Sequence, residues 1–185
     1  MLMGIGIQLT DLAGNPITTV STGDVFLLNM SARDMRPPFD RDGVFATLAD
    51  FLFDPKLLRP VEPAEIVYGD SFTLVQKGSV ASGMIDELGA ASNRLQASGE
   101  SESRIASVQM RALAPGEALI RSESADEPSS EMLMFGLDDA LSPSSIEYER
   151  QSISIGPSVH RFIANRIQTT STATMRSRLL TRWSF

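Results

Sequence analysis

The feature that most constrains the fold is a long apolar segment, residues 43–55, which ends in an Asp-Pro pair. Its side chains alternate with the period of a β-strand. One face carries Phe45, Thr47, Ala49, Phe51 and Phe53, and the other carries Val44, Ala46, Leu48, Asp50 and Leu52. Both faces are largely apolar, so the strand is either covered on both sides or has an apolar outer surface. Proline lacks the backbone donor of a sheet, so we expect the strand to end at Asp54-Pro55.

Shorter alternating segments recur along the rest of the chain as far as residue 155. We predict strands over residues 5–9, 17–20, 26–32, 66–68, 72–75, 105–113, 118–121, 132–135 and 146–155. Gly, Pro, Asn and Asp punctuate these segments, and no amphipathic helical pattern of convincing length interrupts them. The sequence therefore predicts an all-β fold, a two-sheet β-sandwich.

Composition limits the range of functions that this chain can have. With 185 residues and 42% hydrophobic content, the chain has the size and the apolar material for one domain with its own core. It has no cysteine and one histidine, so we expect neither thiolate chemistry nor a Ser-His-Asp catalytic site. No apolar run is long enough to cross a bilayer, and the first residues lack the pattern of a secretory signal. If the domain is exported, we expect the signal to lie elsewhere on a larger parent chain.

Charge divides the chain near Gly156. All 23 acidic residues precede it, together with 11 of the 16 basic ones, so this part has a net charge of −12. An acidic body argues against nucleic acid as a partner. We therefore predict a β-sandwich over residues 1–156 and a basic tail rich in Ser, Thr and Arg over residues 157–185, read as a linker or disordered segment. A basic arm for anionic surfaces and an unusual end of the gene are the alternatives.

Four segments carry a resemblance to a known family. They are Gly43–Pro55, Gly83–Gly89, the Ala112–Gly116 turn and Ile146–Ile155. In this order they resemble cohesin-like domains, and most closely the variants in very large surface or secreted proteins of planctomycete-type bacteria. The resemblance covers roughly residues 5–155. It implies a jelly-roll sandwich of about nine strands, shared with cellulose-binding modules. It also implies an extracellular or cell-surface setting linked to polysaccharide breakdown, and a dockerin partner, a small helical domain that carries calcium.

The same resemblance suggests where a partner would bind. In cohesins, an Asn and an Asp on the outer face of the strand before the aromatic-Asp-Pro motif bond the dockerin. The matching positions here are Ala46 and Leu48, whose side chains neither donate nor accept hydrogen bonds. We therefore take the outward positions Ala46, Leu48, Asp50 and Leu52 as candidate contacts of a more apolar interface. The alternative is that the N-terminal hairpin covers this stripe.

Two other functions stay open at this point. A carbohydrate-binding module of the same fold needs exposed rings that stack on sugars. The rings are few, because Trp183 lies in the tail and Tyr68 and Tyr148 are far apart in sequence. A cleft-type site built from Asp, Asn and one Tyr would leave no sequence signature. The third function is that of a structural spacer in a large surface protein, which has no ligand.

Enzymatic and metal sites are not expected. Asp86 and Glu87 are adjacent, and neighbours on a strand point to opposite faces, so they do not form a facing pair of carboxylates. Calcium could lie in a loop, near Asp138-Asp139 or among Asp34, Asp40 and Asp42, but the spacing of these residues is not that of a calcium loop. We predict no catalytic residue, no cofactor and no metal site in this chain.

Overall fold

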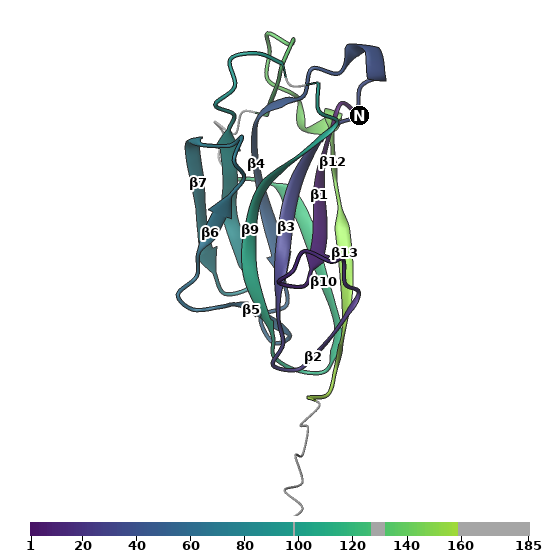
Figure 1. Cartoon of the computed structure of the whole chain (residues 1–185), viewed down its shortest axis with the longest axis vertical. Helices are drawn as coiled ribbons and strands as arrows, with labels where there is room; N and C mark the ends of the chain where they lie inside the picture. The colour runs from purple at the N-terminus through teal and green to yellow at the C-terminus, as the bar shows by residue number, and fades with distance from the viewer. Residues whose placement is uncertain (98, 127–131, 159–185) are drawn as a thin grey trace, which may run out of the picture.

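The computed structural model describes residues 1–97, 99–126 and 132–158, and it is an all-β sandwich of two sheets (Figure 1). Sheet A faces the viewer in Figure 1 and contains, in spatial order, β12 (Ile146–Tyr148), β1 (Met3–Thr10), β3 (Val25–Asp34), β9 (Glu102–Ala112) and β5 (Leu58–Pro60), with β6 (Ile66–Tyr68) also paired to β9. The predicted fold class is confirmed.

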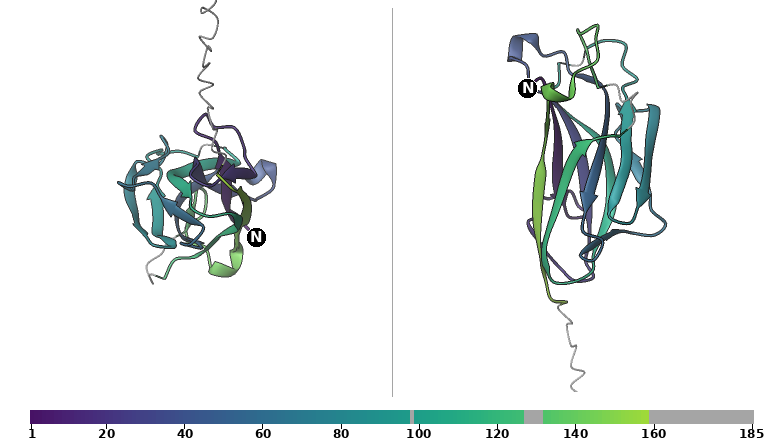
Figure 2. Two further views of the ribbon diagram at one scale, coloured as in Figure 1. Left: turned by 90° about the horizontal axis from the view of Figure 1, so that it is seen from below. Right: turned by 180° about the vertical axis from the view of Figure 1, so that it is seen from behind.

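Sheet B forms the opposite layer, as the rear view in Figure 2 shows. Its strands, in spatial order, are β2 (Thr19–Ser21), β13 (Arg150–Gly156), β10 (Gly116–Ser124), β4 (Val44–Phe53), β8 (Met84–Ala91) and β7 (Leu74–Ala81), with β11 (Leu133–Met134) also paired to β4. Two 3₁₀ turns, Pro38–Asp40 and Pro143–Ser145, complete the regular elements of the described residues.

The core lies between the sheets and follows the alternation of the sequence. Along β3, every second residue from Phe26 to Asp34 is buried, and the residues between them are half-buried. In β4, Ala49, Phe51 and Phe53 belong to the core cluster, as their shared face predicts. Phe45 is half-buried and packs edge-on against the ring of Phe135, with 5.3 Å between ring centroids. A strand period of two thus places the apolar residues of both sheets toward each other.

Two predictions about strands need correction. The hairpin of β7 and β8 was predicted only as a short piece over residues 72–75, and it extends to residue 91. The single strand predicted over residues 146–155 is divided, because β12 pairs with β1 in sheet A while β13 pairs with β10 in sheet B. Glu149 stands at this change of sheet, and its carboxylate accepts the backbone N–H of Ile7. The described residues therefore form 13 strands, several of two or three residues, where about nine were expected.

A buried ion pair holds the loop that leads into β4. Asp34, at the end of β3, is 2% exposed and accepts hydrogen bonds from the guanidinium of Arg36 and from the backbone N–H groups of Arg36 and Gly43. Burial alone would raise the pKa of Asp34, but these hydrogen bonds outweigh it and hold the pKa below its ordinary value. The carboxylate thus joins the two ends of the loop and fixes where β4 begins.

The last strand of the described residues, β13, ends at Gly156, and the division of the chain at this point stays a prediction. Nearly all of the predicted tail, residues 159–185, lies outside the described residues, so its interpretation stays a prediction. A search of the described residues for a helix of the length and hydropathy that a membrane span requires finds none.

Candidate partner-binding face

The four candidate contacts lie on the outer face of sheet B. Ala49, Phe51 and Phe53 point into the core, and the four candidates alternate with them and point outward. Val44, which the sequence analysis placed on the same outer face, instead belongs to the core cluster. Ala46 and Leu52 are half-buried. Leu48 and Asp50 are only 8% and 3% exposed. The outer stripe of β4 is therefore present, but two of its four members are largely covered.

The cover does not come from the N-terminal hairpin. Strand β1 belongs to sheet A, and β2 lies at the far edge of sheet B, where β13 and β10 separate it from β4. Leu48 instead packs against Gly89 of β8, and Asp50 accepts a hydrogen bond from the backbone of Glu87 in the same strand. The alternative in which the N-terminal segment packs over β4 is therefore wrong.

The neighbours of β4 form an apolar groove of about 260 Å³ around Ala46 and Leu48. Its floor is built of cross-strand pairs, because Ala46 is opposite Ala91 and Leu48 is opposite Gly89. On one side Leu133 of β11 is paired with Ala46. The groove exists because small residues on β4 and β8 lie between larger ones on β11 and β7. The full lining is Phe45, Ala46, Thr47, Leu48, Val75, Lys77, Gly89, Ala90, Ala91 and Leu133.

Gly89 is required at the floor of this groove. A Cβ atom at this position would lie 2.3 Å from the carbonyl oxygen of Thr47 and 2.6 Å from Cδ1 of Leu48. Leu48 therefore packs directly on the glycine, which accounts for its low exposure. On its other side the backbone N–H of Leu48 donates to Sδ of Met132 at 3.0 Å. Contacts on both sides of β4 thus fix the position of Leu48 beside the groove.

Val75, on the wall formed by β7, has a strained backbone. Its φ angle is +48°, in the left-handed region that a β-branched residue rarely adopts, and the residue is 71% exposed. Edge strand β7 is exposed along nearly its whole length, and its pairing with β8 shifts register on either side of Lys77. The strain therefore lies at an exposed rim of the groove, where core packing does not require valine.

We expect Val75→Gly to raise the free energy of unfolding by about 1 kcal/mol, because glycine adopts a positive φ without steric cost. The measurement is urea denaturation of the full chain. Val80→Gly, in the same strand at a residue with no positive φ, is the matched control and should lower stability. A loss of stability in Val75→Gly would show that the side chain, and not backbone strain, dominates at this position.

Asp50 adds a negative charge to the middle of the same face. Strand β8 has a β-bulge here, since Ala49 pairs with Leu88 but Phe51 pairs with Ile85. The backbone N–H of Glu87, whose φ is +49°, donates to the Asp50 carboxylate at 2.7 Å. Burial raises the pKa of Asp50, and this hydrogen bond opposes the rise only in part. Asp86 and Glu87 therefore flank Asp50 as part of a bulge, and they are half-buried.

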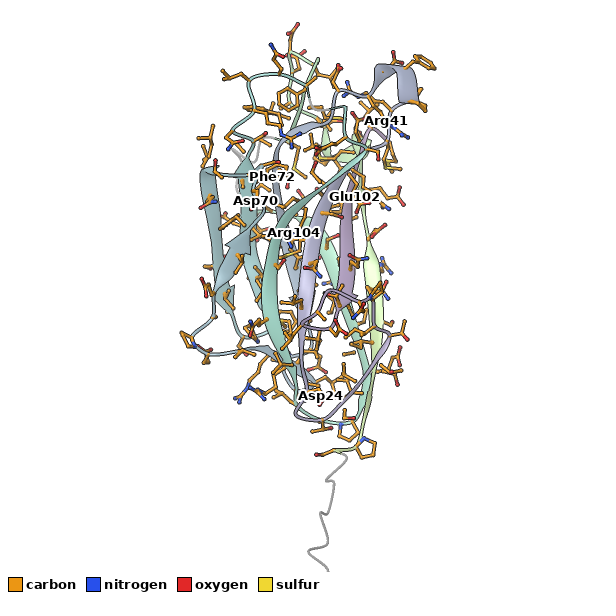
Figure 3. All side chains as sticks on the ribbon, viewed as in Figure 1. Asp24, Arg41, Asp70, Phe72, Glu102 and Arg104 are labelled. Atoms are coloured by element: carbon orange, nitrogen blue, oxygen red, sulfur yellow. The ribbon has the colours of Figure 1, made fainter. Side chains whose placement is uncertain are left out.

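The outer face of sheet A has a different character. It carries a shallow polar cleft of about 370 Å³ that is lined by Gln8, Thr10, Gly14, Leu27, Asn29, Ser31, Glu102 and Arg104. Glu102 and Arg104, both on β9, are labelled in Figure 3. The polar side chains bond one another, as when Ser31 donates to Glu102 at 2.6 Å. No aromatic ring lines this cleft, so it does not provide the stacking surface that the carbohydrate-binding alternative requires.

Within residues 1–97, 99–126 and 132–158, no three His, Asp or Glu side chains gather in the manner of a metal site. One of the suggested calcium ligands, Asp34, is already engaged by Arg36 and by the backbone of Gly43. Its carboxylate oxygens are thus occupied by the loop that they hold together.

No protein-family model matches the sequence, and the comparison with curated proteins finds no match either. Solved structures do match. A cohesin module from a family 33 glycoside hydrolase of Clostridium perfringens is 14% identical, with a TM-score of 0.57, over 85% of this chain and 98% of that one. The seventh ScaB type I cohesin of Pseudobacteroides cellulosolvens is 13% identical, with a TM-score of 0.58, over 84% and 93%.

A third similar structure is the third ScaC cohesin of Acetivibrio cellulolyticus, solved in complex with the ScaB dockerin. It is 14% identical, with a TM-score of 0.55, and the match covers 83% of this chain and 99% of that one. At these identities the likeness concerns the fold. Together with the two-sheet topology, it shows that this chain has the cohesin-like fold that the four sequence segments predicted.

Proposed function

We propose that this chain is a non-catalytic recognition module that binds a dockerin-type protein domain through the groove on the outer face of sheet B. We propose further that it works outside the cell or at its surface, within an assembly linked to polysaccharide breakdown. The groove around Ala46 and Leu48 is the observation that carries the proposal. The similar structures include cohesins solved with dockerins bound, among them one from Acetivibrio cellulolyticus and one from Clostridium thermocellum.

The shape of the groove suits a side chain presented by a helix. Its floor is made of the small residues Ala46, Gly89 and Ala91, with the side chain of Leu48 lying on Gly89. Leu133 and Val75 are the apolar walls on either side. Binding of an apolar helix in such a groove is a common mode of recognition, in which anchors at helical spacing fill the hydrophobic floor. Affinity would come from apolar burial, since neither Ala46 nor Leu48 offers a side-chain hydrogen bond.

The test uses purified dockerin domains encoded by the genome that encodes this chain, titrated calorimetrically into the full chain with and without a calcium chelator. We expect at least one domain to bind in a chelator-sensitive manner. Ala46→Arg should weaken that binding at least tenfold, because the long charged side chain fills the groove from its floor. Leu119→Arg is the matched control, since Leu119 is exposed on the same sheet outside the groove, and it should bind as the unaltered chain does.

Three results would contradict this proposal. Full affinity in a folded Ala46→Arg variant would place the interface elsewhere. Capture by insoluble polysaccharide, tested in a parallel tube without any dockerin, would favour the carbohydrate-binding alternative. If neither dockerins nor polysaccharide bind, the structural spacer becomes the better interpretation.

A further inference from the structure

Asp50 is a buried carboxyl group without an ion-pair partner in the described part of the chain. It lies on β4 and is only 3% exposed. Among the described residues, its one hydrogen-bond partner is the backbone N–H of Glu87, at 2.7 Å. The buried carboxylate of Asp34, by contrast, is bonded by a guanidinium and by two backbone N–H groups. Ionisation of Asp50 therefore costs free energy that one hydrogen bond offsets only in part.

The acidic groups that face Asp50 come from both neighbouring strands. Glu123 of β10 is directly opposite Asp50 in the sheet. Asp86 lies on the other side of β4, in the bulge of β8 that is opposite Asp50. Burial is the main cause of the raised pKa of Asp50, and the charges of Asp86, Asp126 and Glu123 add to it. Ionisation thus places like charges on both sides of β4.

The remaining titratable groups around Asp50 do not neutralise this charge. Arg121 of β10 forms an ion pair with Glu123 at 3.4 Å, and both side chains are about half exposed, so solvent screens the pair. Lys77 lies on β7, and β8 separates that strand from β4. Burial, together with the charge of Asp50, raises the pKa of Tyr148, so this phenol stays uncharged in acidic and neutral solution.

We propose that Asp50 is an acid-responsive latch, in which proton uptake by its carboxyl group closes the contact between β4 and the bulge of β8. The bulge is strained, because Glu87 has a φ of +49°, a region that a residue other than glycine adopts only at a cost. The hydrogen bond from the Glu87 N–H to Asp50 opposes this strain. The latch concerns β4 and β8 alone, so it goes beyond the proposed function and needs no partner.

The two forms of the carboxyl group differ in what they can bond. When Asp50 is ionised, its charge repels those of Asp86 and Glu123, and the strain at Glu87 also favours opening of the bulge. When Asp50 is protonated, its carbonyl oxygen still accepts the N–H of Glu87, and its O–H can donate to a neighbouring carboxylate. A repulsive contact is thereby replaced by a hydrogen bond.

The groove lies next to this latch. Leu48 is two residues before Asp50 on β4, and its cross-strand partner Gly89 is two residues after Glu87 on β8. The contact between Leu48 and Gly89 is therefore the next one along both strands. Opening of the bulge would loosen the floor of the groove, and protonation of Asp50 would tighten it.

The first measurement follows the carboxyl carbon of Asp50 by NMR as the pH of the full chain is lowered, with Asp50→Asn used to assign the signal. We expect a midpoint above the ordinary value of 3.8. From about pH 7 to about pH 4, the protection of the Glu87 amide against hydrogen exchange should rise severalfold. In Asp50→Asn, which keeps the acceptor oxygen but carries no charge, this protection should be high throughout. The amide of Phe53, which donates to the carbonyl of Gly83 in the same strand pair, is the internal reference and should keep its protection.

Urea denaturation tests the sign of the effect. Because the pKa of Asp50 is raised in the folded chain, the stability that its protonated form contributes is present below pH 3.8 and is lost as the pH rises through the folded pKa. The urea midpoint of the unaltered chain should therefore fall relative to that of Asp50→Asn as the pH rises from about 4 to about 7.

Glu123→Gln and Asp86→Asn test the role of the neighbouring charges. Each should move the titration of Asp50 to lower pH, since each removes one repelling charge. Glu117→Gln is the matched control, because Glu117 is exposed on the same strand and face as Glu123 but about 20 Å away, and it should leave the midpoint unchanged. These three variants keep Asp50, so they test the latch even where Asp50→Asn does not fold.

Two results would overturn the latch. One is a titration midpoint of Asp50 at or below 3.8, or a Glu87 amide whose protection does not change with pH. The other is that Glu123→Gln and Asp86→Asn shift the midpoint no more than Glu117→Gln does, since burial and not repulsion would then set the titration. No dockerin enters these measurements, so either result leaves the proposed function to its own test.

Discussion

Replacing Asp34 with alanine should lower the free energy of unfolding by about 3–5 kcal/mol, because it breaks a buried ion pair and leaves Arg36 without its hydrogen-bonded partner. Arg36 would keep its charge at 8% exposure, and the backbone N–H of Gly43 would lose its acceptor. Chemical denaturation at neutral pH measures the effect. Asp40→Ala is the control, since Asp40 is exposed in the same loop and should change stability by at most about 0.5 kcal/mol.

The effect of Asp34→Ala on the free energy of unfolding should depend on pH. The pKa of Asp34 is lower in the folded chain than its ordinary value of 3.8, so the carboxylate stabilises the fold above that pH. This contribution is lost as the pH falls further and the carboxyl group takes up a proton. The stabilities of the unaltered chain and of Asp34→Ala should therefore converge below pH 3.8. A difference that stayed constant with pH would mean that lost packing, and not the charge, causes the effect.

Gly89→Ala should destabilise the fold by about 3 kcal/mol, at the upper end of the usual cost of overpacking. The added Cβ would meet the carbonyl oxygen of Thr47 at 2.3 Å, and this neighbour belongs to the backbone of an interior strand that has little freedom to move. The methyl group would also displace Leu48 and so change the floor of the groove. Thermal unfolding measures the first effect, and dockerin titration measures the second.

Gly156→Ala serves as the control for this change. The nearest atom to an added Cβ there is the carbonyl oxygen of Val20, at an ordinary contact distance of 3.8 Å. We expect a change of at most about 0.5 kcal/mol. A Gly89→Ala variant as stable as the unaltered chain would mean that β4 and β8 separate without cost, contrary to close packing of Leu48 on the glycine.

The strands that were predicted well are those whose alternation is unbroken. In β3, Phe26, Leu28 and Met30 recur at every second position, and the structure buries them all. In β8 the bulge at Asp86 and Glu87 shifts the alternation by one residue, so the pattern on one side of it contradicts the pattern on the other. Periodicity therefore misses a bulged strand even when its residues are as buried as those of a regular one.

For a related reason, the sequence predicted the part of the candidate site that lies on β4 but not the parts on other strands. The alternation within one strand is enough to assign its residues to two faces, so the sequence alone placed Ala46 and Leu48 on the outer face. The opposite wall depends on which strands lie beside β4, which is a property of the topology. Leu133 and Val75 come from segments far away in sequence. The run of small residues from Gly89 to Ala91 was the one local signal that another surface approaches there.

The positions of the two chain ends determine how several such domains could be arranged in tandem. In Figure 1 the N-terminus lies at one pole of the long axis and β13 ends at the opposite pole, while the groove opens on the side of sheet B. Domains joined pole to pole would keep every groove facing sideways and unobstructed. Weak individual contacts would then combine into avidity, with a strength set by the connecting segments.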